Sequence, residues 1–159
     1  MVILEDTRQQ AQKHELKHDY FASEGIELVR TKLPFGDYAL WGSVKAIDTK
    51  ANVEEIAQNI GGAEHARFRE ECKLARRCGG RLIILIENEH GYRCIDDVEA
   101  WVNPNVRKTS RSIEGPRLAK AMRTMSDRYG VEFMFCSPEE AGKIILELLN
   151  ETKRLDKDI

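Results

Sequence analysis

The stretch from Gly36 to Lys50 reads Gly-Asp-Tyr-Ala-Leu-Trp-Gly-Ser-Val-Lys-Ala-Ile-Asp-Thr-Lys, and it decides how the rest of the chain is arranged. Two apolar pieces, Tyr38–Trp41 and Val44–Ile47, are separated by a Gly-Ser pair. Apolar runs joined by such a pair are typical of a β-hairpin. We therefore predict two adjacent antiparallel strands in this stretch.

Charged residues stand at the open end of this predicted hairpin. Asp37 precedes the first strand, while Asp48 and Lys50 close the second. Residues two apart in a strand point to the same face, so Asp48 and Lys50 project together, and the hairpin brings Asp37 alongside them. Two carboxylates and an ammonium group in this position can hold a divalent cation and orient a water for attack on phosphorus.

Length and composition describe an ordinary globular chain. Its 159 residues favour one domain over residues 1–150, with a charged tail at 151–159 that we expect to be frayed. No apolar run reaches the roughly 20 residues that span a bilayer, so we expect no membrane contact. The four cysteines lack Cys-x-x-Cys spacing, which favours reduced thiols in a cytoplasmic protein. The net charge of −2 means that any binding to nucleic acid must depend on local patches.

Hydrophobic periodicity predicts alternating strands and helices along the chain. Asn52 is in position to cap a helix, and the run Arg81–Glu87 has the length and branching of a strand buried on both faces. The order indicates an α/β fold of three layers around a mixed sheet. Besides the hairpin and Arg81–Glu87, the predicted strands are 2–4, 26–29 and 131–136, and the predicted helices are 9–23, 52–60, 64–77, 95–101, 115–129 and 138–149.

The motif residues resemble the nuclease domain of XPF-type structure-specific endonucleases, a branch of the restriction-endonuclease-like PD-(D/E)XK superfamily. That family shows Gly-Asp-Tyr, a variable gap, Glu-Arg-Lys, three residues and Asp. In this chain Gly36-Asp37-Tyr38 matches, Asp48-Thr49-Lys50 stands for Glu-Arg-Lys, and Glu54 falls where the last Asp is expected. The family's opening Asp-x-Arg-Glu corresponds to Asp6-Thr7-Arg8-Gln9. The resemblance extends to about Glu87 and implies a restriction-endonuclease-like fold.

Three departures from the family pattern are visible. Asp48 replaces a Glu and shortens the carboxylate's reach, while Thr49 and Gln9 replace charged residues. Many family members also hold DNA with a helix-hairpin-helix, and none follows in this sequence, so we expect a free-standing nuclease domain.

The resemblance and the residues lead to the same expected chemistry. We expect a metal-dependent endonuclease that cuts phosphodiester bonds, in branched or flapped DNA, with Mg²⁺ or Mn²⁺ held by Asp37, Asp48 and the backbone carbonyl of Thr49. Asp6 is a further candidate ligand. Lys50 is expected to position the nucleophile or offset charge in the transition state, and Glu54 to orient Lys50 or a metal-bound water. A catalytically idle DNA-binding or scaffold subunit is the alternative.

A second motif points to different chemistry. His14-Glu15-Leu16-Lys17-His18 is a literal His-Glu-x-x-His on a predicted helix, the pattern in which two histidines bind zinc and the glutamate acts as general base. The charged residues around it are typical of a solvated helix face rather than of a buried zinc-peptidase helix. A zinc peptidase is therefore the less favoured reading.

DNA binding would depend on clusters of basic residues. Arg8 and Arg67 are candidates for phosphate contacts, and a polar loop predicted at 105–114 adds Arg107, Lys108 and Arg111. Arg117, Lys120 and Arg123 follow at helical spacing, for which a solvated helix face is an equal explanation.

The large apolar residues are expected to pack inside the protein. Core packing is the favoured role of Trp41 and Trp101. The apolar residues of the last strand and helix are core or form a homodimer face: Phe133, Phe135, Ile144, Ile145, Leu148 and Leu149.

Overall fold

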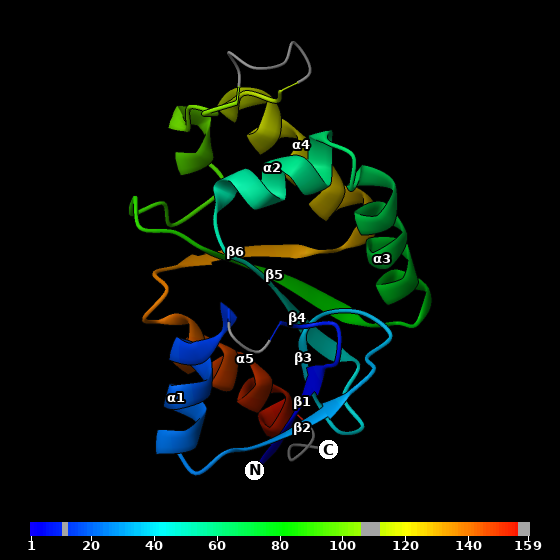
Figure 1. Cartoon of the computed structure of the whole chain (residues 1–159). Helices are drawn as coiled ribbons and strands as arrows, with labels where there is room; N and C mark the ends of the chain where they lie inside the picture. The colour runs from blue at the N-terminus through cyan, green and yellow to red at the C-terminus, as the bar shows by residue number, and fades with distance from the viewer. Residues whose placement is uncertain (11–12, 106–111, 156–159) are drawn as a thin grey trace.

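The structure, a computed structural model, describes residues 1–10, 13–105 and 112–155, the last four of these by backbone alone. In this part of the chain six strands form a single sheet (Figure 1). Their order across the sheet is β2-β1-β3-β4-β5-β6. The strands are β1 (Val2–Asp6), β2 (Glu27–Thr31), β3 (Tyr38–Leu40), β4 (Lys45–Lys50), β5 (Arg81–Glu87) and β6 (Glu132–Cys136).

The sheet is mixed, as predicted. Strand β3 runs antiparallel to both of its neighbours, whereas β1 pairs with β2, β4 with β5 and β5 with β6 in parallel. Tyr38 lies opposite Ile47 and Ala39 opposite Ala46, which confirms the predicted hairpin. Trp41 lies beyond the end of β3 and is 85% exposed, so the prediction that it packs in the core is wrong, while Trp101 is buried.

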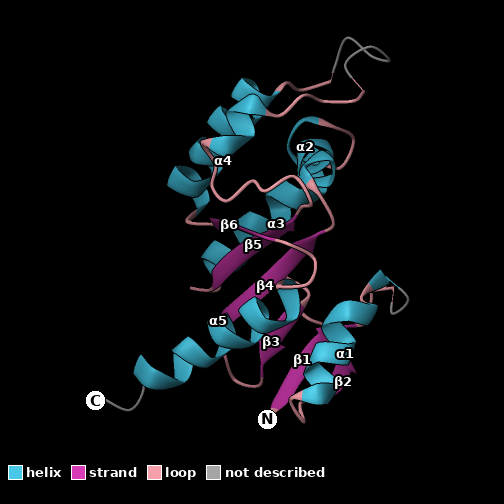
Figure 2. Ribbon diagram, turned by 90° about the vertical axis from the view of Figure 1, so that its left-hand side faces the viewer, coloured by secondary structure: helices cyan, strands magenta, loops and turns pink. Residues whose placement is uncertain are grey.

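Helices cover both faces of the sheet and give the three predicted layers (Figure 2). Two helices, α1 (Glu15–Ser23) and α5 (Ala141–Leu155), lie on one face. Three others, α2 (Val53–Gly61), α3 (His65–Arg77) and α4 (Gly115–Tyr129), lie on the opposite face. Asn52 caps α2 as predicted, with its side-chain oxygen accepting a hydrogen bond of 2.8 Å from Glu55 N.

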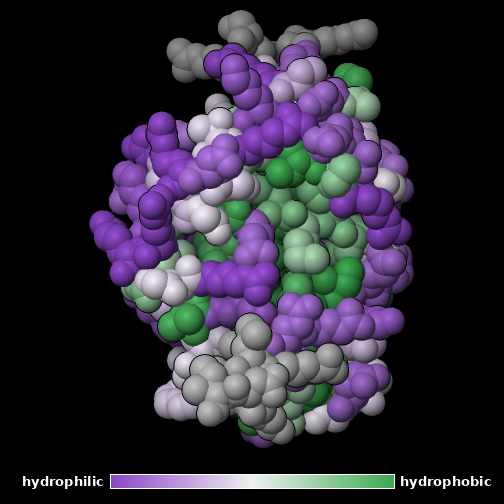
Figure 3. Space-filling model, turned by 180° about the vertical axis from the view of Figure 1, so that it is seen from behind, coloured by the Kyte–Doolittle hydropathy of each residue, from purple (hydrophilic) through white to green (hydrophobic). Residues whose placement is uncertain are grey.

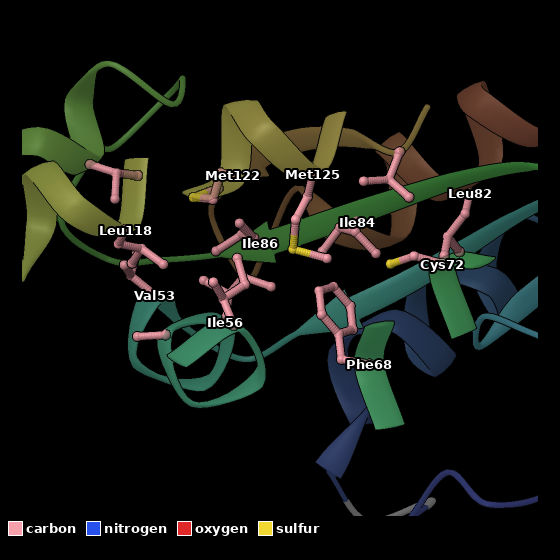
Figure 4. Packing of buried hydrophobic residues seen from close by; sticks show 14 of the residues in the cluster. Val53, Ile56, Phe68, Cys72, Leu82, Ile84, Ile86, Leu118, Met122 and Met125 are labelled. Carbon is pink, nitrogen blue, oxygen red and sulfur yellow. The ribbon is translucent and has the colours of Figure 1, made fainter. Parts of the chain in front are cut away.

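Strand β5 joins the two hydrophobic cores because its side chains alternate between the faces. Ile84 and Ile86 pack with α2, α3 and α4 (Figure 4), and Ile83 and Leu85 pack with α1 and α5. All four side chains have no exposed surface, which confirms the prediction of a strand buried on both sides. The sheet is therefore fixed from both faces along the strand that neighbours β4.

Several element boundaries differ from the sequence prediction. Helix α1 starts at Glu15 instead of about Gln9, because Asp6–Gln9 forms a turn in which Gln9 N donates to Asp6 O. A similar turn over Ser137–Glu140 delays α5 to Ala141. That helix continues to Leu155, so residues 151–155 of the tail predicted to be frayed are helical, and 156–159 lie outside the described residues. The predicted helix at 95–101 is a short 3₁₀ turn, η2 (Asp97–Ala100).

Two further sequence predictions concern the surroundings of the chain. No helix in the described ranges is both long and apolar enough to cross a lipid bilayer. All four cysteines are free thiols, with Cys72 and Cys136 buried and Cys78 and Cys94 exposed.

The burial of β5 leads to a prediction about the free energy of unfolding. Replacing Ile84 by Ala removes three methyl or methylene groups from a site without solvent exposure, and we expect unfolding free energy to fall by about 2–5 kcal/mol. Urea denaturation monitored by circular dichroism measures this change. The exposed Val44→Ala is the control, expected within about 0.5 kcal/mol of wild type. Equal effects of the two substitutions would contradict the packing described for β5.

Candidate active site

The backbone of Asp37 is fixed from both sides. Its N–H donates to Ile47 O of β4, and its carbonyl accepts from Asp6 N of β1, both at 2.8 Å. The residue therefore bridges the ends of two strands immediately before β3 begins. This arrangement places the Asp37 side chain next to the carboxyl end of β4, where Asp48 and Lys50 lie, as the hairpin prediction required.

Gly36 allows this close approach. Its φ of +72° lies in the left-handed region, which glycine adopts without steric cost. A Cβ at this position would lie 2.8 Å from the Ala46 Cβ and 3.2 Å from Ile47 O. Gly36 N donates a hydrogen bond of 2.8 Å to Glu71 Oε1 on α3. The glycine of the Gly-Asp-Tyr motif is therefore required by geometry at the edge of the site.

Asp37, Asp48 and Lys50 come together as predicted. Asp37 Oδ2 accepts hydrogen bonds from Thr49 N at 2.7 Å and Thr49 Oγ1 at 2.8 Å. Lys50 Nζ lies 2.8 Å from Asp48 Oδ2, and 5.4 Å from the ring centre of Phe68. This contact pairs the buried Asp48 Oδ2 with the Lys50 ammonium group, and no other donor among the described residues reaches that oxygen.

These side chains line a small polar hollow of about 170 Å³ between the sheet and the helices α2 and α3. The two aspartates and Lys50 form its floor, each less than a tenth exposed. Helix α2 adds Glu55 and the buried Asn59 to the lining. Phe68 and Glu71 line it from α3, and Arg8 and Arg67 contribute positive charge. The hollow thus combines buried acids with cations.

Burial raises the pKa of Asp48 well above its usual range. Lys50 opposes this rise, whereas the nearby carboxylates of Asp37 and Glu71 add to it. Burial alone would lower the pKa of Lys50, but its contact with Asp48 outweighs that effect and the pKa lies above its usual value. The acids of the hollow are therefore only partly neutralised by Lys50, and a bound cation would stabilise their charged forms.

The donor set fits a hard divalent cation. Asp48 presents a buried carboxylate whose Oδ2 is paired with Lys50, and Asp37 Oδ1 takes part in no hydrogen bond within the described chain. In those same residues no group of three or more His, Cys, Asp or Glu side chains is arranged to hold a metal. Mg²⁺ is usually bound through one or two carboxylates, with waters and substrate oxygens completing its shell. Two carboxylates therefore suffice for such a site.

Asp6 lines the hollow, but its carboxylate is already engaged. Oδ1 accepts from Arg8 N and Nε at 2.8 and 2.7 Å, while Oδ2 accepts from Arg8 Nη2 and Leu33 N at 2.9 and 2.8 Å. Burial alone would raise the pKa of Asp6, but these hydrogen bonds hold it below its usual value. Asp6 thus anchors the turn after β1 to the segment before β3, a role that the sequence pattern did not reveal.

Glu54 is not among the residues that line the hollow, contrary to its expected role. It lies at the first turn of α2 and accepts a hydrogen bond from Asn105 Nδ2. Glu55 and Glu71 line the hollow instead. Helical spacing offered a signal for Glu71, because it lies three residues after Phe68 and four before Ala75, both buried on α3.

The basic residues predicted to contact DNA fall into two groups. Arg8 and Arg67 line the hollow and expose much of their side chains, Arg67 to 78%, although each is paired with an acid, Asp6 or Glu64. Arg107, Lys108 and Arg111 lie outside the described residues.

The two histidines of the His-Glu-x-x-His motif lie 6.3 Å apart, measured between ring centres. His14 stands before the first residue of α1, and His18 Nε2 lies 2.6 Å from Glu5 Oε1. Glu5 also accepts a hydrogen bond of 3.2 Å from the Tyr38 hydroxyl. These contacts hold α1 against the sheet, on the face opposite the hollow. They give His18 a structural role.

Comparison with known proteins supplies a family and a fold. A family model, the ERCC4 domain, matches residues 6–148. XPF from Aeropyrum pernix has a similar structure, with a TM-score of 0.68 and 19% identity over 99% of this chain and 68% of that chain. XPF from Aeropyrum pernix in complex with DNA gives a TM-score of 0.66 and 17% identity, over 96% of this chain and 65% of that chain. No curated protein sequence matches the chain.

The position of Gly36 leads to a prediction about stability. Gly36→Ala and Gly25→Ala both place an alanine at a φ near +70°, which costs roughly 1–2 kcal/mol in either case. Only the first also brings a Cβ within 2.8 Å of Ala46, so we expect it to lose about 1–3 kcal/mol more. Urea unfolding of both variants measures the difference. Equal losses of unfolding free energy in the two variants would contradict the prediction, because β4 would then have moved to accommodate the added methyl group.

Proposed function

We propose that this chain, which belongs to the ERCC4 domain family, is a metal-dependent endonuclease that hydrolyses phosphodiester bonds in branched or flapped DNA. The observation that carries the proposal is the convergence of Asp37, Asp48 and Lys50 in one polar hollow, where the buried Asp48 is paired with Lys50 at 2.8 Å. A catalytically idle scaffold has no need to bury two acids beside one lysine, because Lys50 offsets only part of their charge and the remainder is costly to bury.

The acids would hold the divalent cation. Asp37 and Asp48 supply carboxylate oxygens, and the carbonyl of Thr49 is the further oxygen expected from the family motif. Bound Mg²⁺ or Mn²⁺ would polarise a phosphoryl oxygen and lower the pKa of a bound water. Thr49 has a second role, because its N–H and hydroxyl fix one oxygen of Asp37 and leave the other for binding.

Lys50 is the candidate for handling the attacking water. Its ammonium group lies beside Asp48 and over the Phe68 ring, so its position is set by an ion pair and a cation–π contact. A fixed cation at this point orients a water through its lone pair and offsets the negative charge that develops on the phosphate. Glu71, which lines the same hollow, fixes Gly36 rather than Lys50.

The basic residues around the catalytic hollow favour DNA as the substrate. The structural similarity to an XPF protein solved with DNA supports DNA binding. Arg8 and Arg67 line the hollow and would contact backbone phosphates. The sequence offers Arg107, Lys108 and Arg111, which lie outside the described residues, as further phosphate contacts. Contacts of this kind fix the position of a strand without reading its sequence, so a preference for junctions or flaps must come from the shape of the DNA.

A homodimer is a further part of the proposal. Strand β6 forms one edge of the sheet, and α4 and α5 flank it on the side seen from behind in Figure 3. That view shows an apolar area bordered by hydrophilic side chains. Phe133, Met134 and Ile144 are half-buried, whereas Ile145 and Leu149 belong fully to the core. An open strand edge beside half-buried apolar side chains favours self-association.

The catalytic proposal is tested by cleavage of labelled duplex, flap and four-way-junction DNA with Mg²⁺ or Mn²⁺. Asp48→Asn keeps the shape of the side chain but removes the charge, and we expect it to lower the cleavage rate by at least about a thousandfold, as losses of a central catalytic group do. Calorimetric titration should show Mn²⁺ binding to the wild type and none to the variant. The exposed Glu27→Gln is the charge-matched control and should cut like wild type.

Two results would contradict this assignment. Undiminished cleavage by a folded Asp48→Asn variant would remove Asp48 from the site. Binding of branched DNA without cleavage, by wild type and variant alike, would favour the scaffold alternative. If the purified protein contains zinc, and replacing His14 removes that zinc, the zinc-peptidase hypothesis would be favoured instead.

Sedimentation velocity tests the dimer. Ile144→Lys places a charge in the half-buried apolar area, and we expect it to shift a wild-type dimer to the monomer because an unpaired ammonium group is costly to bury. Leu16→Lys, at an exposed position on α1, is the control and should remain a dimer. A wild-type monomer at all concentrations tested would remove this part of the proposal.

A further inference from the structure

A second hollow lies on the far side of α3 from the candidate active site. It has a volume of about 440 Å³ and lies between α4 and the junction of α2 with α3. Four cationic side chains line it: Arg69 from α3, and Arg117, Lys120 and Arg128 from α4. Ile60, Met125 and Tyr129 contribute apolar surface to the same lining. We refer to it as the basic hollow.

Among the described residues, the cations of the basic hollow lack ion-pair partners. No Asp or Glu lines it, and within the described ranges none of its four cationic side chains forms an ion pair with an acid. Arg123, on the same helix, behaves differently, because it pairs with Asp96 at 2.5 Å and Glu99 at 2.7 Å. The chain as a whole carries a net charge of −2. Positive charge is therefore concentrated here against the overall balance.

The spacing of the α4 residues makes the hollow elongated. Arg117, Lys120, Thr124 and Arg128 follow one another at intervals of three or four residues and so form a row on one face of the helix. Eleven residues separate the first from the last, which corresponds to about 16 Å along a helix. A row of this length suits a linear polyanion better than a single small anion.

The lining also includes groups that can contact bases. Tyr129 is half-buried at the end of α4, and the half-buried His65 begins α3. The His65 Nδ1 is buried and has no hydrogen-bond partner in the described part of the chain. Aromatic surface combined with a positively charged groove is how proteins bind single-stranded nucleic acid, whose bases are free to stack. In a duplex the bases are already stacked on one another.

The basic hollow is close to the candidate active site. His65 and Arg69 lie one turn apart on α3, and Arg67 and Glu71, which line the catalytic hollow, lie about half a turn away from them around the same helix. The two hollows are thus separated by the width of one helix, about 10–12 Å with side chains. The exposed Arg67 lies on the catalytic side of α3 and offers a phosphate contact on the way between them.

We propose that the basic hollow binds a single-stranded segment of the DNA substrate, such as a displaced flap, as it leaves the catalytic hollow across α3. The row of cations contacts the phosphates of this segment, and the surface around Tyr129 receives bases. The inference rests on the proposed function for its substrate. Beyond the proposed function, the inference assigns a binding surface to the single-stranded flap, separate from the surface that holds the duplex.

Fluorescence anisotropy of a labelled thymidine 12-mer in EDTA tests the inference without any cleavage. The double variant Arg117→Gln/Lys120→Gln should bind about tenfold more weakly than wild type, and the slope of log affinity against log salt should fall by about 1.4, roughly 0.7 for each lost phosphate contact. Arg123→Gln, which removes one charge from the same helix, is the matched control and should bind within twofold of wild type. Circular dichroism confirms that each variant is folded.

The outcomes separate this inference from the catalytic proposal. Glu27→Gln, at an exposed position on β2 that lines neither hollow, should bind the 12-mer like wild type. If the wild type cuts no DNA but binding of the 12-mer still depends on Arg117 and Lys120, the inference holds and the catalytic proposal fails. If the double variant binds the 12-mer as tightly as wild type, the inference is overturned even where cleavage is observed. A glutamate 12-mer peptide that binds wild type as tightly as the oligonucleotide would also overturn it, in favour of an acidic protein partner.

Discussion

The two backbone hydrogen bonds of Asp37 are the constraint on which the rest of the structure depends. They join β1 to β4 through one residue, and the turn that delivers Asp37 is possible only because Gly36 lacks a Cβ. From there the antiparallel β3 reverses the chain and places Asp48 and Lys50 on the same face. The parallel strands β5 and β6 extend the sheet from β4, so the acids at the end of β4 are supported by the most deeply buried part of the fold.

That support is needed because the site itself is unfavourable for folding. Asp48 is 4% exposed, and both the burial and the neighbouring carboxylates disfavour its charged form. Lys50 compensates only in part. The stabilisation comes from elsewhere, namely from the two cores on either side of β5, in which Ile83, Ile84, Leu85 and Ile86 have no exposed surface. A rigid sheet covered on both faces can hold like charges close together, which a loop could not.

The sequence predicted the sheet, the hairpin and the convergence of Asp37, Asp48 and Lys50, because all three follow from periodicity two and a tight turn. It did not predict the role of Asp6, because Leu33, which donates to this carboxylate, is distant in the sequence and becomes its neighbour only when β2 packs beside β1. It also assigned Glu54 to the site by its spacing from Lys50, whereas the orientation of α2 places Glu55 in the hollow instead. Spacing along the chain locates residues within an element, but the direction in which an element packs is a tertiary property.

The same distinction explains why basic residues are hard to interpret before the fold is known. Arg117, Lys120 and Arg123 are equivalent by helical spacing, and a solvated face accounted for them as well as a nucleic-acid contact did. The structure separates them through their partners. Asp96, just before η2, and Glu99, within it, pair with Arg123, whereas no acid in the described ranges pairs with Arg117 or Lys120. A phosphate that approached Arg123 would be repelled by the two carboxylates that already contact this arginine, so Arg123 is the weaker phosphate ligand. Positive charge that the fold leaves uncompensated is thus a better guide to an anionic ligand than positive charge counted in the sequence.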